Sequence, residues 1–384
     1  MKQPSGGARA WWVAADPAMR VAVLPFVVSR GIVVLSAALA RYLVTDLHPR
    51  SLAAAHAANA GLLGWDATWY RRITEHGYAT LGHQALRFFP LLPVVSRALG
   101  AVPGVQAGIA LLVVSNVAAF AAFALLYRLV LFEVGDEPTA RRAVWLLALA
   151  PSAFVLVMGY AESLLLVTTL VAFLGIRERR YGLAICAGFA AGLCRPVGVL
   201  LVVPAVIEAV RNWPVAPRAE RALALGAVAA APLGTAAYLA WVQVTVGGAG
   251  AFLLPLREQL SRSHRGVVAD PLTTLARDAH DFVRGAHLGT AQHAPWAVVM
   301  VVLAVYLFLK LPVSYGGYAA ATLVVALSAP NLDSLERYGM ACFPFAIAVA
   351  MLTGRRSVRW AVLALAGSLL TVYGLLAFLG LYVP

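Results

Sequence analysis

Apolar runs long enough, or nearly long enough, to cross a lipid bilayer recur along the whole chain, and nearly all charged residues lie outside these runs. A helix of about 20 predominantly apolar residues spans the hydrocarbon core of a membrane. Of the 384 residues, 61% are hydrophobic and only 12% are charged, whereas about 25% are charged in ordinary soluble domains. The sequence therefore predicts an all-α polytopic membrane protein and excludes a soluble or disordered chain.

Eleven runs are predicted to be transmembrane helices of a single membrane-embedded unit that comprises residues 1–384. They are residues 21–44, 105–132, 143–158, 163–176, 181–193, 197–210, 222–246, 296–311, 313–328, 338–353 and 360–381. Several are shorter than a full crossing, so we expect broken or tilted helices among them. Residues 88–102 form a further short run with Pro90 and Pro93, which favours an interfacial helix over a spanning one.

The basic residues predict the orientation of the chain. With a cytoplasmic N-terminus, the cytoplasmic segments collect just over half of the 30 Lys and Arg residues and crowd them into short loops, as the positive-inside rule requires. The two long loops, residues 45–103 and 247–295, then lie outside. We attribute the net charge of +13 mostly to the basic residues that set the orientation of the chain in the membrane. No nucleic-acid partner is predicted. The first run is too long for a signal peptide and contains Arg30, so we expect an uncleaved first span.

Ionisable residues from separate segments are predicted to lie at the outer boundary of the membrane. Asp66 lies in the first outer loop, whereas Glu162, Arg195 and Arg337 lie at outer ends of apolar runs. Charged groups at a membrane boundary are costly unless they serve a site or a cavity. A site that faces outward is therefore expected.

Asp66 has two interpretations that the residues alone leave open. It begins a segment in which Trp69, Ile73 and Gly77 recur at helical spacing, which predicts a short interfacial helix. The carboxylate could cap this helix by accepting backbone hydrogen bonds. It could also act as a general base, because Trp65 and Trp69 flank it at the water boundary and supply a low-dielectric wall.

The other charged residues have structural alternatives as well. Glu162 at a helix start is favourably placed in the helix dipole, Arg195 could extend to lipid headgroups, and Glu336-Arg337-Tyr338 could hold a local ion pair. Arginine is, however, the best side chain for a phosphate. No glycine-rich nucleotide motif and no metal-ligand spacing is present, so sugar transfer from a lipid phosphate is predicted, without a cofactor or a metal.

Several motifs, in the order in which they occur along the chain, resemble those of a known family. They are Trp65-Asp66-x-x-Trp69-Tyr70-x-x-Ile73 with Gly77-Tyr78, Phe88-Phe89-Pro90-Leu91-x-Pro93, Pro151-Ser152-x-Phe154, Tyr160-x-Glu162-Ser163-Leu164, Gly192-x-x-Arg195-Pro196 and Arg337-Tyr338. Together they resemble the GPI mannosyltransferase 2 (PIG-V-like) family of the membrane glycosyltransferase C superfamily. The resemblance implies that the protein transfers mannose from a polyprenyl-phosphate-mannose donor, by an inverting reaction, to a glycolipid or glycan acceptor.

The resemblance also implies roles for individual residues. Asp66 matches the acidic residue of the first outer loop to which the superfamily assigns catalysis. The substrate-binding residues expected beside it are Trp65, Trp69, Tyr70, Phe89, Glu162, Arg195, Arg337 and Tyr338. The arginine-rich composition and the lack of a retention signal predict a plasma-membrane location. The rival hypothesis is a transporter or flippase of lipid-linked sugars, which typically has inverted repeats; no such repeat is visible.

Overall fold

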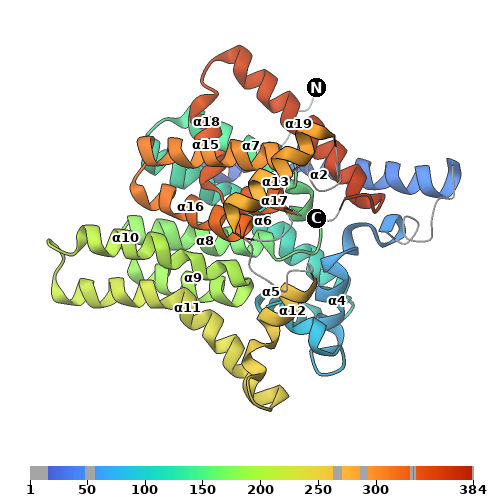
Figure 1. Cartoon of the computed structure of the whole chain (residues 1–384), viewed down its shortest axis with the longest axis horizontal. Helices are drawn as coiled ribbons and strands as arrows, with labels where there is room; N and C mark the ends of the chain where they lie inside the picture. Colours follow the sequence, from blue (N-terminus) through green and yellow to red (C-terminus); the bar gives the residue numbers. More distant parts are fainter. Residues whose placement is uncertain are drawn as a thin grey trace, which may run out of the picture.

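The computed structural model describes residues 16–47, 57–262, 270–285, 293–328, 332 and 334–382, and every regular element in these ranges is helical (Figure 1). The first half contains α2 (Pro17–Tyr42), η1 (Leu43–Leu47), η2 (Gly61–Leu63), α4 (Asp66–His76), η3 (His83–Arg87), α5 (Leu91–Gly100), α6 (Ala107–Val134), α7 (Glu137–Ala148), η4 (Ala153–Leu156), α8 (Glu162–Arg177) and α9 (Tyr181–Cys194). The second half contains η5 (Pro196–Leu201), α10 (Val202–Asn212), α11 (Arg218–Val246), η6 (Ala251–Leu253), α12 (Leu254–Arg262), α13 (Pro271–Arg284), α15 (Ala294–Lys310), α16 (Val313–Leu327), α17 (Leu335–Ala341), α18 (Pro344–Leu352) and α19 (Arg356–Phe378).

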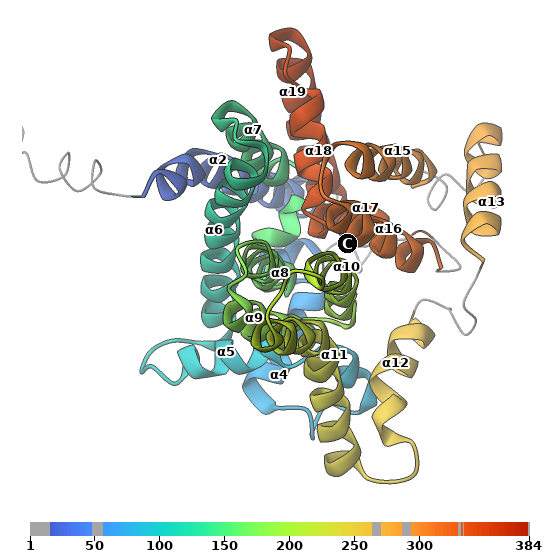
Figure 2. The same ribbon diagram turned by 90° about the vertical axis from the view of Figure 1, so that its left-hand side faces the viewer.

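Four helices are long and apolar enough to cross a membrane: α2 with its continuation to Thr45, α6, α11 and α19. A fifth candidate is the pair α17 and α18, which meet at an angle of 82°. Shorter apolar helices, including α9, α15 and α16, occupy other predicted spans. The prediction of an all-helical membrane protein is thus confirmed, whereas the count of eleven crossings stays a prediction. Figure 2 shows α8, α9 and α10 nearly end-on, with α12 and α13 to one side of them.

Two predicted spans are broken near a proline, and a third begins irregularly at one. In the run 143–158, α7 ends at Ala148, shortly before Pro151, and a short 3-10 helix follows. The run 197–210 begins as the 3-10 helix η5 at Pro196, and 338–353 breaks before Pro344. Proline lacks the N–H group that a continuous helix needs and disfavours helical geometry in the residue before it. These breaks place irregular backbone next to Glu162, Arg195 and Arg337.

Glycines allow α9 to pack very closely against α11. A Cβ atom at Gly192 would lie 2.1 Å from the carbonyl oxygen of Ala231, and one at Gly234 would lie 2.1 Å from that of Phe189. Both separations are far below van der Waals contact, so neither position tolerates a side chain without backbone movement. Small residues permit such approaches between membrane helices. The approach fixes the C-terminal end of α9, where Arg195 follows.

Arg30, inside the first span, is bonded within the protein. Its Nε donates to Asn116 Oδ1 at 3.1 Å, and its Nη2 donates to the carbonyl oxygen of Leu156 at 3.0 Å. Its guanidinium lies over the ring of Phe26, 3.9 Å from the centroid. The charge thus ties α2 to α6 and to the irregular segment that leads into α8.

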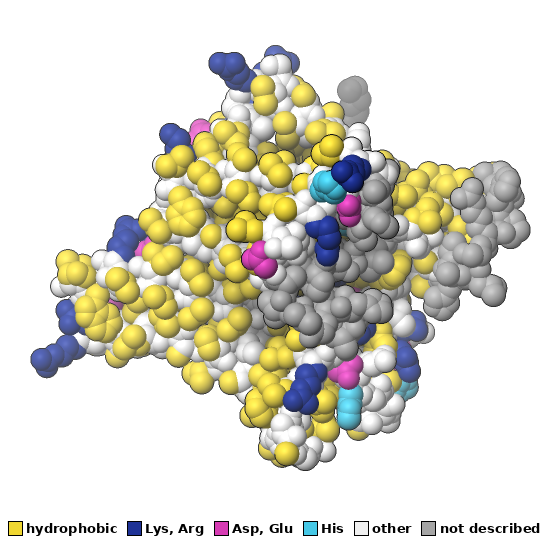
Figure 3. Space-filling model, in the orientation of Figure 1, with side chains coloured by type: hydrophobic (Ala, Val, Ile, Leu, Met, Phe, Trp, Pro, Cys, Tyr) yellow, Lys and Arg dark blue, Asp and Glu magenta, His cyan; other side chains and the backbone are white. Residues whose placement is uncertain are grey.

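Charged side chains gather at opposite ends of the helices. Figure 1 places the α10–α11 turn at the left and α4, α5 and α12 at the right. Figure 3 shows Lys and Arg side chains along the left edge, a broad hydrophobic face beside them and further charged side chains at the right. This distribution fits a protein embedded in a membrane. Which end faces the cytoplasm stays a prediction.

A buried network of ion pairs lies at the end of the helices opposite α4. Arg177 Nε lies 2.6 Å from Glu133 Oε1, and its Nη1 lies 2.9 Å from Glu208 Oε2. Tyr315 and Ser314 donate to the same two carboxylates at 3.0 and 2.7 Å. The network joins α6, α8, α10 and α16.

Replacing Arg177 with Gln is expected to lower the free energy of unfolding by about 3–5 kcal/mol, because two buried carboxylates lose their counter-charge. The thermal unfolding midpoint in detergent measures this effect. The matched control is Arg141→Gln, which removes an exposed ion pair with Glu137 and should leave the midpoint nearly unchanged. Equal midpoints for the two variants would contradict the importance of the network.

Candidate active site

Four charged side chains from distant parts of the sequence meet in one group, which we call the charge cluster: Asp66, Glu162, Arg195 and Arg337. Arg337 Nη1 donates to Asp66 Oδ2 at 3.1 Å, and Arg337 Nε lies 3.4 Å from Glu162 Oε1. Arg195 Nη1 also pairs with Glu162 Oε1. The four residues that the motifs singled out separately are therefore linked in a continuous chain of ion pairs.

The charge cluster is buried. The side chains of Asp66, Glu162 and Arg337 are 8%, 1% and 9% exposed, and that of Arg195 is 14% exposed. Two carboxylates balance two guanidinium groups, which reduces the large cost of burying charge. Glu162 Oε2 is buried without a hydrogen-bond partner among the described residues. Such an atom costs stability unless a water molecule or a ligand bonds to it.

Asp66 is held by the start of α4. It is the first residue of this helix, and Trp65 takes the N-cap position without a side-chain cap bond. Trp65 adopts a φ of 55° and donates from Nε1 to the carbonyl oxygen of Ala377 at 3.0 Å. The backbone N–H of Asp66 donates to the hydroxyl of Tyr160 at 3.1 Å. The unusual turn thus directs the Asp66 carboxylate toward Arg337.

Glu162 and Arg195 are held at the ends of α8 and α9. Glu162 is the first residue of α8, where a carboxylate is favoured by the helix dipole. The thiol of Cys194 donates to the carbonyl oxygen of Ala161 at 3.3 Å, which joins the two helix ends. Arg195 has extended backbone and is followed by Pro196, so its side chain leaves the helix toward Glu162 rather than toward lipid headgroups.

The aromatic residues predicted to bind substrate do not lie together in the structure. The rings of Trp69 and Tyr70 pack on Phe88, with centroids 5.8 and 5.1 Å away. Tyr70 is buried, and this burial raises the pKa of its hydroxyl above the ordinary range. Phe89 lies in a separate packing cluster, 4.6 Å from the ring of Tyr238, and Tyr338 is partly buried in α17. None of these rings has a direct polar bond to the charge cluster among the described contacts.

Glu336 does not form the local ion pair with Arg337 that was one interpretation of the sequence. Instead its carboxylate lies 2.8 and 3.0 Å from Nδ1 of His293. It also accepts from the hydroxyls of Tyr373 at 3.4 Å and Tyr382 at 3.1 Å. We call these four residues the Glu336 hub. His293, Tyr373 and Tyr382 were not among the residues predicted from the sequence, because no local motif connects them.

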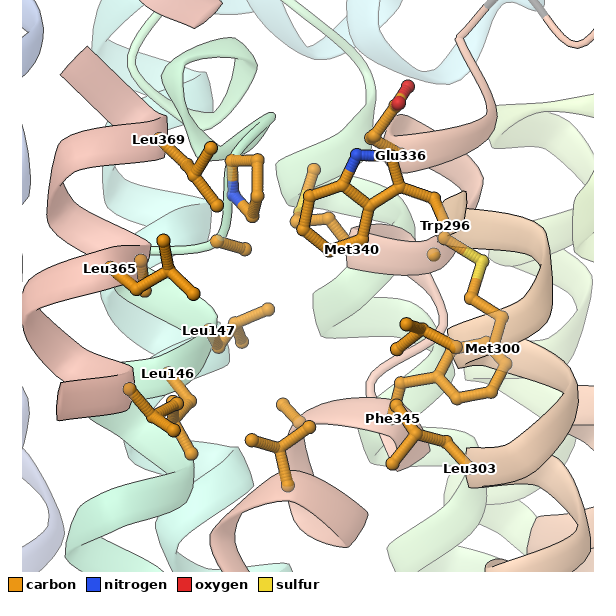
Figure 4. A pocket seen from close by; sticks show the side chains of 18 residues that line it. Leu146, Leu147, Trp296, Met300, Leu303, Glu336, Met340, Phe345, Leu365 and Leu369 are labelled. Carbon is orange, nitrogen blue, oxygen red and sulfur yellow. The ribbon is translucent and has the colours of Figure 1, made fainter. Parts of the chain in front are cut away.

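An apolar cavity of about 390 Å³ lies beside α17. Figure 4 shows its two walls, with Leu365 and Leu369 of α19 facing Trp296 and Met300 of α15, and with Glu336 at one end. The remaining lining comes mainly from α7, α17 and α18. Leu365 is exposed at the surface, so the cavity is an open groove rather than a sealed void.

This arrangement can hold an amphipathic anion. The two arginines offer fixed donors for a phosphate, Asp66 offers a carboxylate that can accept a proton, and the adjacent groove offers an apolar surface. Groups of three or more His, Cys, Asp and Glu side chains that could hold a metal ion are absent from the described residues.

The family model described as Mannosyltransferase (PIG-V) matches residues 26–203, a segment that contains Asp66, Glu162 and Arg195 but not Arg337. No curated protein matches the chain. The family match confirms the resemblance that the motifs predicted. The matched segment is slightly less than half of the chain, and together with the apolar, all-helical architecture it supports a membrane glycosyltransferase that resembles the PIG-V-like mannosyltransferase family.

Proposed function

We propose that the protein transfers mannose from a polyprenyl-phosphate-mannose donor to a glycolipid or glycan acceptor at the outer face of the plasma membrane, with inversion at the anomeric carbon. The observation that carries this proposal is the charge cluster, in which two arginines and two carboxylates lie together next to an apolar groove. A lipid-linked sugar phosphate has the matching parts: an anion, a polar sugar and a long apolar chain.

Arg195 and Arg337 hold the phosphate of the donor. Their guanidinium groups offer directed hydrogen bonds that stabilise the charge developing on the phosphate as the bond to the anomeric carbon breaks. Phosphate is a good leaving group, so most of the rate enhancement comes from orientation and charge complementarity. Glu162 Oε2 has no hydrogen-bond partner among the described residues, so it can accept a hydrogen bond from a hydroxyl group of the sugar.

Asp66 accepts the proton of the acceptor hydroxyl. That hydroxyl oxygen forms the new bond to the anomeric carbon, the bond from this carbon to the phosphate oxygen breaks, and the proton passes to the Asp66 carboxylate. In the resting protein Arg337 occupies this carboxylate at 3.1 Å. Because the donor phosphate competes for Arg337, donor binding releases Asp66 for the acceptor. The donor therefore binds before the acceptor.

The groove holds the first part of the polyprenyl chain. Burial of each methylene contributes about 0.8 kcal/mol, so even a short length of chain adds substantially to donor affinity. The groove and the charge cluster are connected through α17, because Glu336 lines the groove and the next residue, Arg337, bonds to Asp66.

Replacing Leu365 with Trp is expected to raise the KM of a long-chain donor about tenfold, because the larger ring fills the groove. The KM of a donor analogue with a very short prenyl chain should change little. Val372→Trp is the matched control, since Val372 is exposed on the same helix and lies outside the groove lining. If both variants affect long and short donors alike, the groove does not hold the chain.

The rival function is flipping of lipid-linked sugars without transfer. The two functions are distinguished by incubating the purified protein with radiolabelled polyprenyl-phosphate-mannose and a membrane lipid extract. A transferase consumes the donor and makes a new labelled product. A flippase moves the intact donor between leaflets and makes none.

A further inference from the structure

The carboxylate of Glu336 is surrounded by the other three residues of the hub, and it has no role in the proposed transfer reaction. His293, Glu336, Tyr373 and Tyr382 are 2%, 3%, 8% and 3% exposed. An ionised carboxylate only accepts hydrogen bonds, so His293 donates from Nδ1 and the two tyrosines donate from their hydroxyls. Burial and the neighbouring carboxylate raise the pKa of Tyr382 well above its ordinary value, so this hydroxyl remains a donor at physiological pH.

The partners of Glu336 come from three places that surround α17. His293 lies at the start of α15, Tyr373 lies in α19, and Tyr382 follows the end of α19. Trp296 of α15 donates to the hydroxyl of Tyr373 at 3.0 Å and also lines the groove. The hub thus joins α17 to the two helices that form the facing walls of the groove.

The helix α17 needs such an anchor. It has seven residues and begins after Ser334, which adopts a φ of 66°. Helices of this length are unstable without tertiary contacts, and a non-glycine residue with positive φ is strained. Besides the hub, Ser152 donates to the carbonyl oxygen of Glu336 at 2.8 Å. These contacts converge on the residue immediately before Arg337.

Consecutive side chains on a helix diverge by about 100°, so one residue of α17 reaches the hub while the next reaches the charge cluster. A rotation or shift of α17 would move Arg337 away from both Asp66 and Glu162. We propose that Glu336 is a positioning residue that, through its hydrogen bonds to His293, Tyr373 and Tyr382, holds Arg337 in place to bind the donor phosphate. This inference rests on the proposed function of the charge cluster.

The test is the variant Glu336→Gln, which keeps the shape of the side chain but removes its charge. The expected result is a donor KM raised about tenfold with kcat changed less than twofold, because the bound complex restores the position of Arg337. In the background Arg337→Gln, the same substitution should lower kcat/KM no further. A residue that acts through another shows this non-additivity, whereas additive losses would overturn the proposal.

Three further variants separate positioning from stability. His293→Asn keeps a donor near the position of Nδ1 and should retain most donor affinity, whereas His293→Ala should match Glu336→Gln. Tyr382→Phe removes a single hydrogen bond, so it provides a milder test if Glu336→Gln does not fold. Arg177→Gln, at the opposite end of the helices, is the control for a destabilised protein and should leave the donor KM unchanged.

Each outcome of this series is decisive. If Arg177→Gln raises the KM as much as Glu336→Gln does, or if Glu336→Gln binds the donor like the wild type, the positioning role is wrong. Failure of the wild type to bind or consume polyprenyl-phosphate-mannose would instead refute the proposed function itself.

Discussion

Replacing Asp66 with Asn is expected to lower kcat at least about a thousandfold while the protein binds its donor about tenfold more tightly. The loss follows because an amide cannot accept the proton of the acceptor hydroxyl, and general bases contribute 10²–10⁴-fold to rates. The gain follows because Arg337 loses its charged partner at 3.1 Å and becomes available to the phosphate. Transfer of radiolabelled mannose and equilibrium donor binding measure the two effects.

The opposite changes in rate and affinity distinguish catalysis from general damage. Damage to the fold does not produce this pair of opposite changes, and Arg177→Gln, which destabilises the protein away from the charge cluster, serves again as the control that should leave donor affinity unchanged. If the Asn variant transfers sugar at nearly the wild-type rate, Asp66 is not the base. If transfer is lost and donor affinity stays the same, Asp66 keeps its role but the exchange of Arg337 between carboxylate and phosphate is wrong.

Replacing Arg337 with Gln is expected to weaken donor binding about a hundredfold and to lower the free energy of unfolding by about 3–5 kcal/mol. The substitution removes a phosphate ligand and leaves Asp66 and Glu162 buried with one guanidinium between them, and an uncompensated buried charge has a cost of this size. Donor affinity and the thermal unfolding midpoint measure the two effects.

The double variant, Asp66→Asn with Arg337→Gln, provides the internal check. It removes one charge of each sign, so it should unfold at a higher temperature than Arg337→Gln alone while remaining inactive. Contacting residues show such coupling in double-mutant cycles. Additive destabilisation would mean that the two side chains do not interact as the structure places them.

Local patterns were sufficient to predict much of the fold and the residues of the charge cluster. Hydropathy placed α2, α6, α11 and α19 within a few residues of their bounds, because long apolar runs leave little choice of structure in a membrane. The cluster residues share motifs with a family, and each is a charged side chain next to an apolar run. Such residues are conspicuous in sequence because burial of charge needs a reason.

Tertiary features were not predictable in this way. A local pair with Arg337 was one interpretation of Glu336, since adjacent opposite charges suggest one, yet its partners His293 and Tyr382 are 43 and 46 positions away. No periodicity or spacing encodes such a contact, which follows only from the arrangement of α15, α17 and α19.

The most direct test of the account is a transfer assay with the purified protein in sealed vesicles, supplied with polyprenyl-phosphate-mannose labelled in the sugar and with a membrane lipid extract as acceptor. The account predicts that label passes from the donor into a new glycolipid or glycan, that wild-type protein is required, and that Asp66→Asn abolishes the product. Intact donor that merely changes leaflet, with no labelled product, would contradict it.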